Sequence, residues 1–361
     1  MLFPTLETPV PLVDLDRMER NLDRVAAYAT RHRLALRPHI KTHKSPLIAS
    51  MQLRRGATGV TCATPREAEA MSEVCQDILV AYPPVGGPRL RRLLALPPRV
   101  RLTVALDSAE AVEELAAAAD RAGRRPRVLV EADLGMHRVG VATPSEVVQL
   151  ARLIGERPTL EYAGLAFYPG HVREPVAEQE ERLAELAASI GAFVGALGDA
   201  GLPPTTVSGG STPTLFSSHT LPGVTEIRPG TYVFNDRSTA EVGACAWEDC
   251  ALTVLATVVS TAVHGQAVVD AGTKALGREP LRATGGNGFG IVLEHPDVYV
   301  RAMSEEHGIL ELHGSPWTPR IGEQVRIIPN HVCIVVHLND VVYGVRGDTV
   351  EMTWPVAARG R

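Results

Sequence analysis

The chain has 361 residues, 45% of them hydrophobic, so it is long enough to bury a large core and to form more than one domain. Its 36 basic and 41 acidic side chains give a formal net charge of −5, and no excess of positive charge favours a nucleic-acid partner. No apolar run reaches the ~20 residues of a membrane span, the N-terminus lacks the pattern of a secretion signal, and the five scattered cysteines argue against a disulfide framework. We therefore expect a cytoplasmic globular protein with reduced thiols.

Short β-rich runs alternate with amphipathic helical segments from about residue 34 to residue 230. The eight runs lie at 34–38, 59–63, 77–81, 102–106, 127–132, 161–167, 205–208 and 224–227. Capping boxes with proline at the first helical position begin helices at Thr64 and Thr143, and Asp107 is a third candidate cap. Eight strand–helix units predict an α/β fold, a (β/α)8 TIM-type barrel over residues 11–235. A doubly wound open sheet is the alternative, but no GxGxxG follows an early strand.

The pattern changes after about residue 236. Runs at 251–263, 266–272, 324–329 and 332–338 have β character, and no long helical segments separate them. This pattern predicts a separate, mostly antiparallel C-terminal β domain over residues 236–361, joined by residues 1–10.

Basic and imidazole side chains gather in RPHIKTHK, residues 37–44, directly after the first run. A solvated basic loop is the simple interpretation, but other polar residues follow the later runs in the same way. They are Asp133, His137 and Arg138 after the fifth run, Tyr168 and His171 after the sixth, Ser208 to Thr212 after the seventh, and Arg228 and Gly230 after the eighth. Barrel enzymes build their sites at this carboxyl face of the strands.

A lysine and a phosphate-binding loop on one barrel face indicate pyridoxal phosphate. The turn SGGSTPT, residues 208–214, can offer backbone N–H groups and hydroxyls to a phosphate. Lys41 can form a Schiff base with the cofactor's aldehyde. We expect the nearby cations Arg37, His39 and Lys44 to lower the pKa of Lys41 and so favour the neutral nucleophile.

Seven motifs in order along the chain resemble the D-threonine aldolase / D-serine dehydratase family, fold-type III pyridoxal phosphate enzymes related to alanine racemase. They are RPHIKTHK, EADLGMHRVGV, SGGSTPT, EIRPGTYVFND, VVDAGTKAL, SEEHGIL and IPNHVC. The resemblance implies that Lys41 carries the cofactor, that Arg138 reaches its phenolic oxygen, and that Arg228 lies where racemases place an arginine on the ring nitrogen. The other cofactor-binding residues that it implies are Tyr168, Ser208, Gly209, Gly210, Ser211, Thr212, Gly230 and Thr231.

His331 and Cys333 in IPNHVC form a candidate metal site. On a strand, two residues with this spacing point to one face, and imidazole with thiolate suits Zn²⁺ while admitting other divalent ions. A buried structural pair is the alternative, and the resemblance favours a catalytic zinc or manganese ion. We expect His337 to be structural, whereas Asp270 can orient a metal ligand or close a turn.

The resemblance implies a lyase that cleaves D-3-hydroxy-amino acids by a retro-aldol reaction to glycine and an aldehyde. Its alternatives are dehydration to a 2-oxo acid and ammonia, an amino-acid racemase, and a non-catalytic pyridoxal phosphate-binding protein. His171 or His307 is the expected aldolase base. The expected partners are a small D-amino acid substrate and a second copy of the chain in a homodimer, with neither nucleic acid nor membrane.

Overall fold

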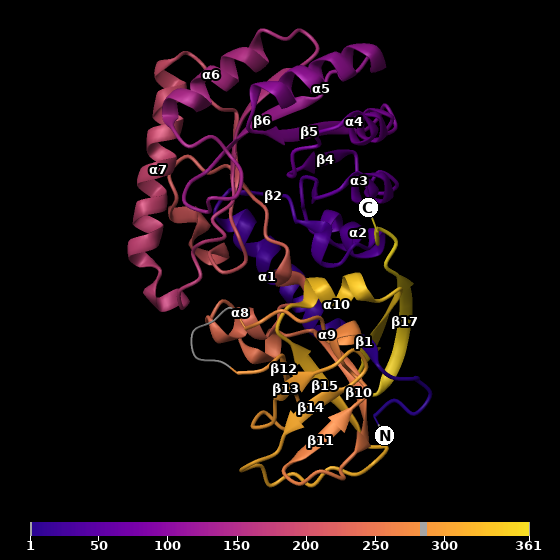
Figure 1. The fold of residues 1–361 in the computed structure, drawn as a ribbon. Helices are drawn as coiled ribbons and strands as arrows, with labels where there is room; N and C mark the ends of the chain where they lie inside the picture. Colours follow the sequence, from indigo (N-terminus) through magenta and orange to yellow (C-terminus); the bar gives the residue numbers. More distant parts are fainter. Residues whose placement is uncertain (1, 282–286, 361) are drawn as a thin grey trace. The chain divides into compact units, whose positions relative to one another are not determined.

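The computed structural model describes residues 2–281 and 287–360, and these divide into two compact units (Figure 1). Unit 1 comprises Met1–Asp23, Thr42–Lys44 and Thr231–Ala357. Unit 2 comprises Arg24–Lys41, Ser45–Gly230 and Ala358–Arg361. This division differs from the predicted one: residues 11–23, which we assigned to the barrel, belong to unit 1, and unit 2 ends its main segment at Gly230 rather than at residue 235.

Unit 2 contains the predicted barrel sheet of eight parallel strands. In spatial order they are β2 (Ala35–Leu36), β9 (Glu226–Ile227), β8 (Thr206–Gly209), β7 (Glu161–Phe167), β6 (Arg127–Ala132), β5 (Arg101–Leu106), β4 (Asp77–Val80) and β3 (Val60–Cys62). A parallel bridge between His39 and Thr61 joins the two ends of this series and closes it. Each of the eight predicted runs overlaps one strand, so the alternation of apolar runs and helices identified the sheet correctly.

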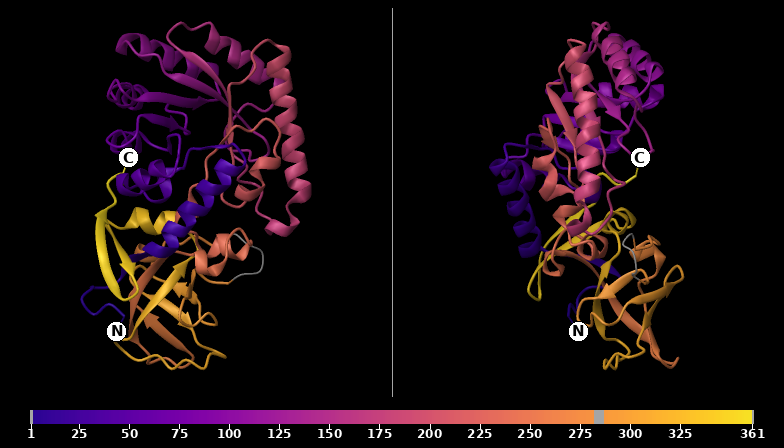
Figure 2. Two further views of the ribbon diagram at one scale, coloured as in Figure 1. Left: turned by 180° about the vertical axis from the view of Figure 1, so that it is seen from behind. Right: turned by 90° about the vertical axis from the view of Figure 1, so that its left-hand side faces the viewer.

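Helices lie outside the sheet of unit 2, as Figure 2 shows. They are α2 (Pro46–Arg54), α3 (Pro65–Met71), α4 (Gly87–Leu94), α5 (Ala109–Ala122), α6 (Pro144–Gly155) and α7 (Glu180–Asp199), while α1 (Leu15–Arg31) contributes residues to both units. Strand residues alternate between this outer layer and the barrel interior. In β6, Val128 and Val130 belong to the large cluster that includes the helices, whereas Leu129 belongs to a small inner cluster.

Two of the three predicted helix caps are confirmed. Thr143 forms the predicted capping box in full. The Thr64 side chain accepts from the Glu67 amide, but the Glu67 carboxylate accepts from the Ala63 amide, so Thr64 is an N-cap without the predicted box. The third prediction was wrong, because Ser108 occupies the N-cap position of α5. The Asp107 carboxylate instead accepts a hydrogen bond from the Gly140 amide at 2.9 Å and so holds a loop at the carboxyl end of β6.

Unit 1 is a nine-stranded, mostly antiparallel sheet, as predicted. Its main path is β13 (Val300–Met303), β14 (Gly308–Glu311), β11 (Gln266–Val269), β10 (Leu252–Ser260), β1 (Val10–Asp14), β16 (Val341–Arg346) and β17 (Thr349–Pro355), with β15 (Gln324–Pro329) beside β10 and β12 (Gly290–Val292) beside β15. The N-terminal β1 pairs with β10 and β16, and this pairing is why residues 11–23 belong to unit 1. No helix among the described residues is long and apolar enough to cross a membrane.

The segment 332–338 corrects our expectation, because it is the helix α10 (Val332–Leu338) rather than a strand. Its apolar run has no alternation, and periodicity alone does not distinguish a short buried helix from a buried strand. The buried side chains are Val332, Val335 and Val336, at the i, i+3, i+4 spacing of one helical face. Unit 1 also contains the short helices α8 (Arg237–Glu241) and α9 (Thr273–Leu276).

Candidate functional site

Lys41 is the one lysine of the chain that lies at the carboxyl face of the barrel strands. The sequence contains only three lysines, Lys41, Lys44 and Lys274. Lys274 is exposed and forms an ion pair with Glu306 at 2.5 Å, and Lys44 is a buried residue of unit 1. Lys41 is half-buried in the short helix η1 (Ile40–Thr42) that follows β2. It is therefore the lysine best placed to hold a cofactor in unit 2.

The ring of Tyr168 brings two predicted site residues together. The Lys41 Nζ lies 5.7 Å from the ring centroid, and the Arg138 guanidinium carbon lies 4.9 Å from the same centroid. These side chains follow β2, β6 and β7, whose carboxyl ends share one face of the barrel. A Cβ on Gly170 would come within 2.2 Å of the Tyr168 ring, so this glycine leaves the space that the ring occupies.

Asp133 shapes the loop that carries Arg138. Its Oδ1 accepts from the amides of Gly135 and His137, and its Oδ2 accepts from His137 Nδ1 at 3.0 Å. Although partial burial raises the pKa of Asp133, these hydrogen bonds outweigh it and hold that pKa below its ordinary value. His137 has a positive φ of 53°, which the hydrogen bonds to Asp133 stabilise.

The cations of RPHIKTHK do not act together as expected. Arg37 is buried, and its guanidinium donates to Glu226 Oε2 at 2.7 Å and to Asp77 Oδ1 at 2.9 Å. Two carboxylates therefore neutralise the charge of Arg37. Arg37 is a structural residue of the barrel.

The loop after β8 has the features of an anion site. Gly210 has a φ of +95°, and a Cβ there would meet nothing closer than 3.6 Å. Gly210 and Thr212 are buried, and within the described residues their backbone N–H groups have no hydrogen-bond acceptor. Buried N–H groups without an acceptor are rare in folded proteins. This loop therefore fits the phosphate of a cofactor. Of the other predicted phosphate ligands, Gly230 ends the main segment of unit 2 and Thr231 begins that of unit 1.

Three predicted cofactor ligands are engaged within the protein. The Ser208 hydroxyl donates to Glu226 Oε1 at 2.6 Å, and the Ser211 hydroxyl bonds to Thr214 Oγ1 at 3.0 Å. Arg228 donates through Nη1 to the carbonyl and hydroxyl oxygens of Ser208, both at 2.8 Å, and through Nη2 to a backbone carbonyl of β7. Burial lowers the pKa of Arg228 from its ordinary value. Arg228 thus joins the ends of three strands, and Gly209 is fixed by packing because a Cβ would come within 2.2 Å of Phe167.

The two predicted catalytic histidines differ in environment. His171 follows β7 beside Gly135, its Nδ1 is buried with no hydrogen-bond partner among the described residues, and burial lowers its pKa. A neutral imidazole with a free nitrogen suits a general base. His307 is exposed in the turn between β13 and β14 of unit 1, where its carbonyl accepts from the Ser304 amide. The structure therefore favours His171 over His307 as a base.

His331 and Cys333 are close together in unit 1, at the start of α10 rather than on a strand. His331 occupies the N-cap position, and Cys333 lies in the first turn with its sulfur 3.2 Å from Thr42 Oγ1. His331 Nδ1 donates to Asp236 Oδ2 at 3.1 Å, and the His331 side chain also forms a hydrogen bond with the side chain of Cys333. The negative charge of Cys333 and the hydrogen bond to Asp236 raise the pKa of His331 to about 11. A divalent cation can replace the proton that such a pair holds, so the donors fit a metal ion.

Sequence reasoning missed Asp236. This carboxylate is fully buried, accepts from the amide and hydroxyl of Thr239 through Oδ1, and accepts from His331 and from the Val332 amide through Oδ2. Its position before α8, in a capping arrangement with Thr239, was the available signal. Asp270, which we considered for this role, instead accepts from Thr8 Oγ1 and the Thr257 amide and joins the N-terminal segment to β10.

The described part of the chain contains no cluster of three or more histidine, cysteine or acidic side chains that could hold a metal. His337 lies in the last turn of α10.

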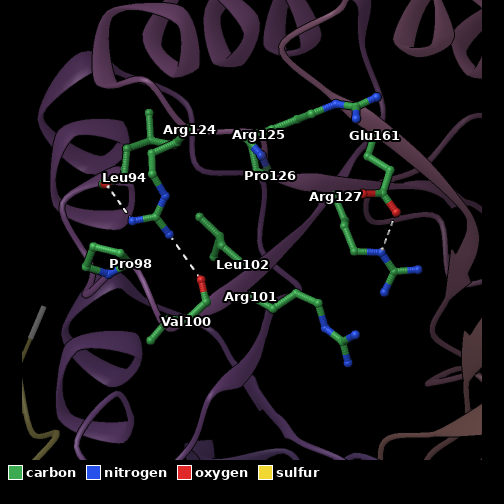
Figure 3. A pocket seen from close by; sticks show the side chains of 10 residues that line it. All are labelled: Leu94, Pro98, Val100, Arg101, Leu102, Arg124, Arg125, Pro126, Arg127 and Glu161. Carbon is green, nitrogen blue, oxygen red and sulfur yellow. Dashed lines mark hydrogen bonds and ion pairs between the residues drawn. The ribbon is translucent and has the colours of Figure 1, made fainter.

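A basic cavity of about 200 Å³ lies at the amino ends of β5, β6 and β7 (Figure 3). Its arginines have protein partners: Arg124 donates to the carbonyls of three residues, Arg125 donates to a backbone carbonyl, and Arg101 and Arg127 form ion pairs with Asp77 and Glu161. These contacts tie loops and strand starts together, so we interpret the cavity as structural. Residues at the amino-terminal face of a barrel usually contribute to stability rather than to catalysis.

The comparisons with known proteins cover almost the whole chain. The sequence matches the alanine racemase N-terminal domain over residues 13–238 and a serine dehydratase domain over residues 251–345. It is 33% identical over 366 residues to a D-threonine aldolase of Arthrobacter sp, which covers 98% of this chain and 93% of that protein. It is 35% identical over 376 residues to a D-threo-3-hydroxyaspartate dehydratase of Delftia sp. (strain HT23), with 97% of each chain covered.

Solved structures show similarity to the same two kinds of enzyme. A D-threonine aldolase from Filomicrobium marinum has a TM-score of 0.90 at 34% identity, with 98% of this chain and 95% of that chain covered. Solved structures of D-threo-3-hydroxyaspartate dehydratase include a histidine-to-alanine variant and, in the metal-free form, a cysteine-to-alanine variant; the two altered positions are two residues apart. His331 and Cys333 have that spacing in the present chain.

Proposed function

This chain belongs to the D-threonine aldolase / D-serine dehydratase family, and from that membership we propose that it is a pyridoxal phosphate- and divalent-metal-dependent lyase acting on D-3-hydroxy-amino acids. The observation that carries the proposal is the convergence of Lys41, Arg138 and Tyr168 at the carboxyl face of the barrel. We propose that Lys41 holds the cofactor covalently and that the amides of Gly210 and Thr212 bind its phosphate. Bound pyridoxal phosphate supplies an electron sink for charge that develops at Cα.

The metal is proposed to be zinc or manganese, bound by His331 Nε2 and the Cys333 thiolate. Its chemistry is that of a Lewis acid for the substrate's β-hydroxyl group. Asp236 fixes the tautomer of His331 by accepting the Nδ1 proton, so that Nε2 presents its lone pair. The histidine and cysteine variants of the related dehydratase support this assignment.

Retro-aldol cleavage to glycine and an aldehyde is the proposed reaction. It requires a base for the β-hydroxyl proton, and the unpartnered, neutral His171 can accept that proton at Nδ1. Dehydration to a 2-oxo acid and ammonia is the second candidate, since a dehydratase is among the relatives. In that reaction Lys41 would take the Cα proton. A homodimer and a cytoplasmic location stay predictions from the sequence.

Product analysis separates the two reactions. Enzyme loaded with cofactor and metal is incubated with D-threonine, D-serine and D-3-hydroxyaspartate, and with each L-enantiomer. We expect glycine and an aldehyde from the D-substrates. Formation of 2-oxo acid and ammonia without glycine would establish the dehydratase, and turnover of the L-enantiomers alone would refute both.

A further inference from the structure

We propose that Asp133 is a positioning residue for His171 as well as for Arg138, because its carboxylate fixes the loop against which the His171 imidazole packs. The consequence for catalysis rests on the proposed function, in which His171 is the base. The contacts that fix the loop do not depend on that function, so the two can be tested separately.

The loop after β6 begins and ends at the same place. At its start the Asp133 amide donates to the Val141 carbonyl at 2.9 Å, and at its end the Val141 amide donates to a β6 carbonyl at 3.0 Å. Next to this closure the Gly140 amide donates to Asp107 Oδ2 at 2.9 Å. A Cβ on Gly140 would come within 2.4 Å of the Asp133 nitrogen, so the two ends are in close contact. Residues 134–139 between them therefore form a closed loop.

The Asp133 carboxylate holds the middle of this loop. Its Oδ1 accepts from the Gly135 amide at 3.0 Å and from the His137 amide at 2.9 Å, and its Oδ2 accepts from His137 Nδ1 at 3.0 Å. Neither amide has another acceptor among the described residues. Removing the carboxylate would therefore leave both N–H groups without a protein partner and release the loop.

Gly135 is the contact between this loop and His171. It has a φ of +117°, and a Cβ there would come within 2.9 Å of His171 Nε2 and within 3.1 Å of its Cε1. The imidazole therefore packs directly against the backbone of residue 135. Its buried Nδ1 has no hydrogen-bond partner among the described residues, so no bond to that atom orients the ring. Packing against Gly135 is thus a main constraint on the position of the proposed base.

Arg138 depends on the same carboxylate. His137 has a φ of +53°, and both its amide and its Nδ1 bond to Asp133, which fixes the direction in which the chain continues. The next residue is Arg138, whose guanidinium carbon lies 4.9 Å from the centroid of the Tyr168 ring. One carboxylate therefore sets the positions of the proposed base and of the arginine at the cofactor site.

This positioning matters because proton transfer needs a distance of about 2.6–3.2 Å between the base and the atom that carries the proton. A misplacement of about 1 Å can cost roughly 100-fold in rate. We therefore expect the loss of the Asp133 carboxylate to reduce kcat by about 10- to 100-fold, with a smaller change in KM.

The first experiment compares Asp133→Ala with Asp133→Asn and Glu146→Ala in turnover of D-threonine. An asparagine Oδ1 can accept from both loop amides, so D133N keeps these hydrogen bonds and removes the charge. Glu146 is the matched control: its carboxylate also accepts from two backbone amides, at 2.8 and 3.0 Å, at the start of α6. We expect kcat to fall in D133A, to recover most of its value in D133N, and to be unchanged in E146A. A kcat of D133A equal to that of E146A, or a D133N as slow as D133A, would overturn the proposal.

The second experiment tests the contact with His171 through Gly135→Ala and Gly86→Ala. Gly86 has a φ of +99°, and a Cβ there would meet nothing within 4 Å. Both substitutions place a side chain on a residue with a φ near +100°, so both cost stability, but only G135A places a Cβ against His171. We expect kcat to fall in G135A and not in G86A, while both keep the visible band of the cofactor. A normal kcat in G135A would refute the contact.

Hydrogen exchange of the apoprotein tests the loop without the cofactor. The amides of Gly135 and His137 should exchange faster in D133A than in wild type, D133N or E146A, and equal exchange in D133A and wild type would overturn the proposal. If D133A does not fold, a slow G135A beside a normal G86A supports the proposal, and a normal G135A refutes it. Wild-type holoenzyme that turns over no D-3-hydroxy-amino acid would instead refute the proposed function and leave the exchange experiment valid.

Discussion

Replacing Asp236 with asparagine should weaken metal binding without removing a metal ligand. Asp236 accepts from His331 Nδ1 at 3.1 Å and from the Val332 amide at 3.3 Å through Oδ2, and from the Thr239 amide at 2.9 Å through Oδ1. An asparagine has only one accepting oxygen, so its NH₂ group must face donors on one side or the other. If it faces His331, the imidazole must accept at Nδ1 and carry its proton on Nε2, where the metal would bind.

The expected loss follows from the role of a hydrogen-bond partner behind a metal-ligating histidine. Such partners usually contribute a factor of about 10 to 100 in metal affinity. That range corresponds to roughly 1.4–2.8 kcal/mol of binding free energy. Asp236 also caps α8, so the variant should lose stability as well, and a control must separate the two effects.

Asp270→Asn is the matched control. This carboxylate, in the same unit, accepts from Thr8 Oγ1 and from the Thr257 amide and touches neither proposed metal ligand. Metal affinity is measured by competition with a chromophoric chelator, and stability by denaturant unfolding of the apoproteins. We expect both variants to lose stability, but only Asp236→Asn to lose metal affinity. Wild-type metal affinity in Asp236→Asn would refute the proposed orientation of His331.

Three further predictions concern the cofactor, the metal and the barrel. Borohydride reduction of the holoenzyme should fix the cofactor to Lys41; Lys41→Ala should lose the visible band and the activity, whereas Lys274→Ala, which removes only an exposed ion pair, should keep both. Cys333→Ala should lose bound metal and turnover but keep the visible band, because the proposed cofactor ligands lie on the barrel. Cys245→Ala is the control, and normal metal content in Cys333→Ala would contradict the proposed metal site. Asp77→Asn should cost about 3 kcal/mol of unfolding free energy at pH 7, because it breaks a buried ion pair. Burial raises the pKa of Asp77, but hydrogen bonds and charges from arginines outweigh it and hold this pKa below its ordinary 3.8 in the folded state. The contribution of Asp77 to folding stability is therefore complete above pH 3.8 and disappears as the pH falls through the folded-state pKa. Unfolding curves of wild type and Asp77→Asn should therefore converge at low pH, and a constant difference would count against this reasoning.

The sequence by itself determined the architecture and the face of the barrel sheet at which the candidate site residues lie. Strand periodicity located all eight barrel strands, and parallel strands in a closed sheet place their carboxyl ends together whatever the details of packing. That rule was enough to assign Lys41, Arg138 and Tyr168 to one face, because each follows a strand of the same sheet. The glycine-rich turn was readable for a similar reason, since a positive φ at Gly210 is a local backbone requirement.

Only the tertiary structure decided which polar groups are free and which are already occupied. Asp236 and His331 are 95 residues apart, and no local pattern connects them. Ser208 and Arg228 were predicted to be cofactor ligands, but the pairing of distant strands commits their donors to Glu226 and to backbone oxygens. Arg37, expected to act on Lys41, is likewise committed to Glu226. Residues 332–338 form a helix although their β-branched side chains favour strands, because the helix buries Val332, Val335 and Val336 on one face. Long-range packing overrides the local backbone preference where it buries apolar surface or pairs a buried charge. The free energies of these contacts are larger than the differences in backbone propensity.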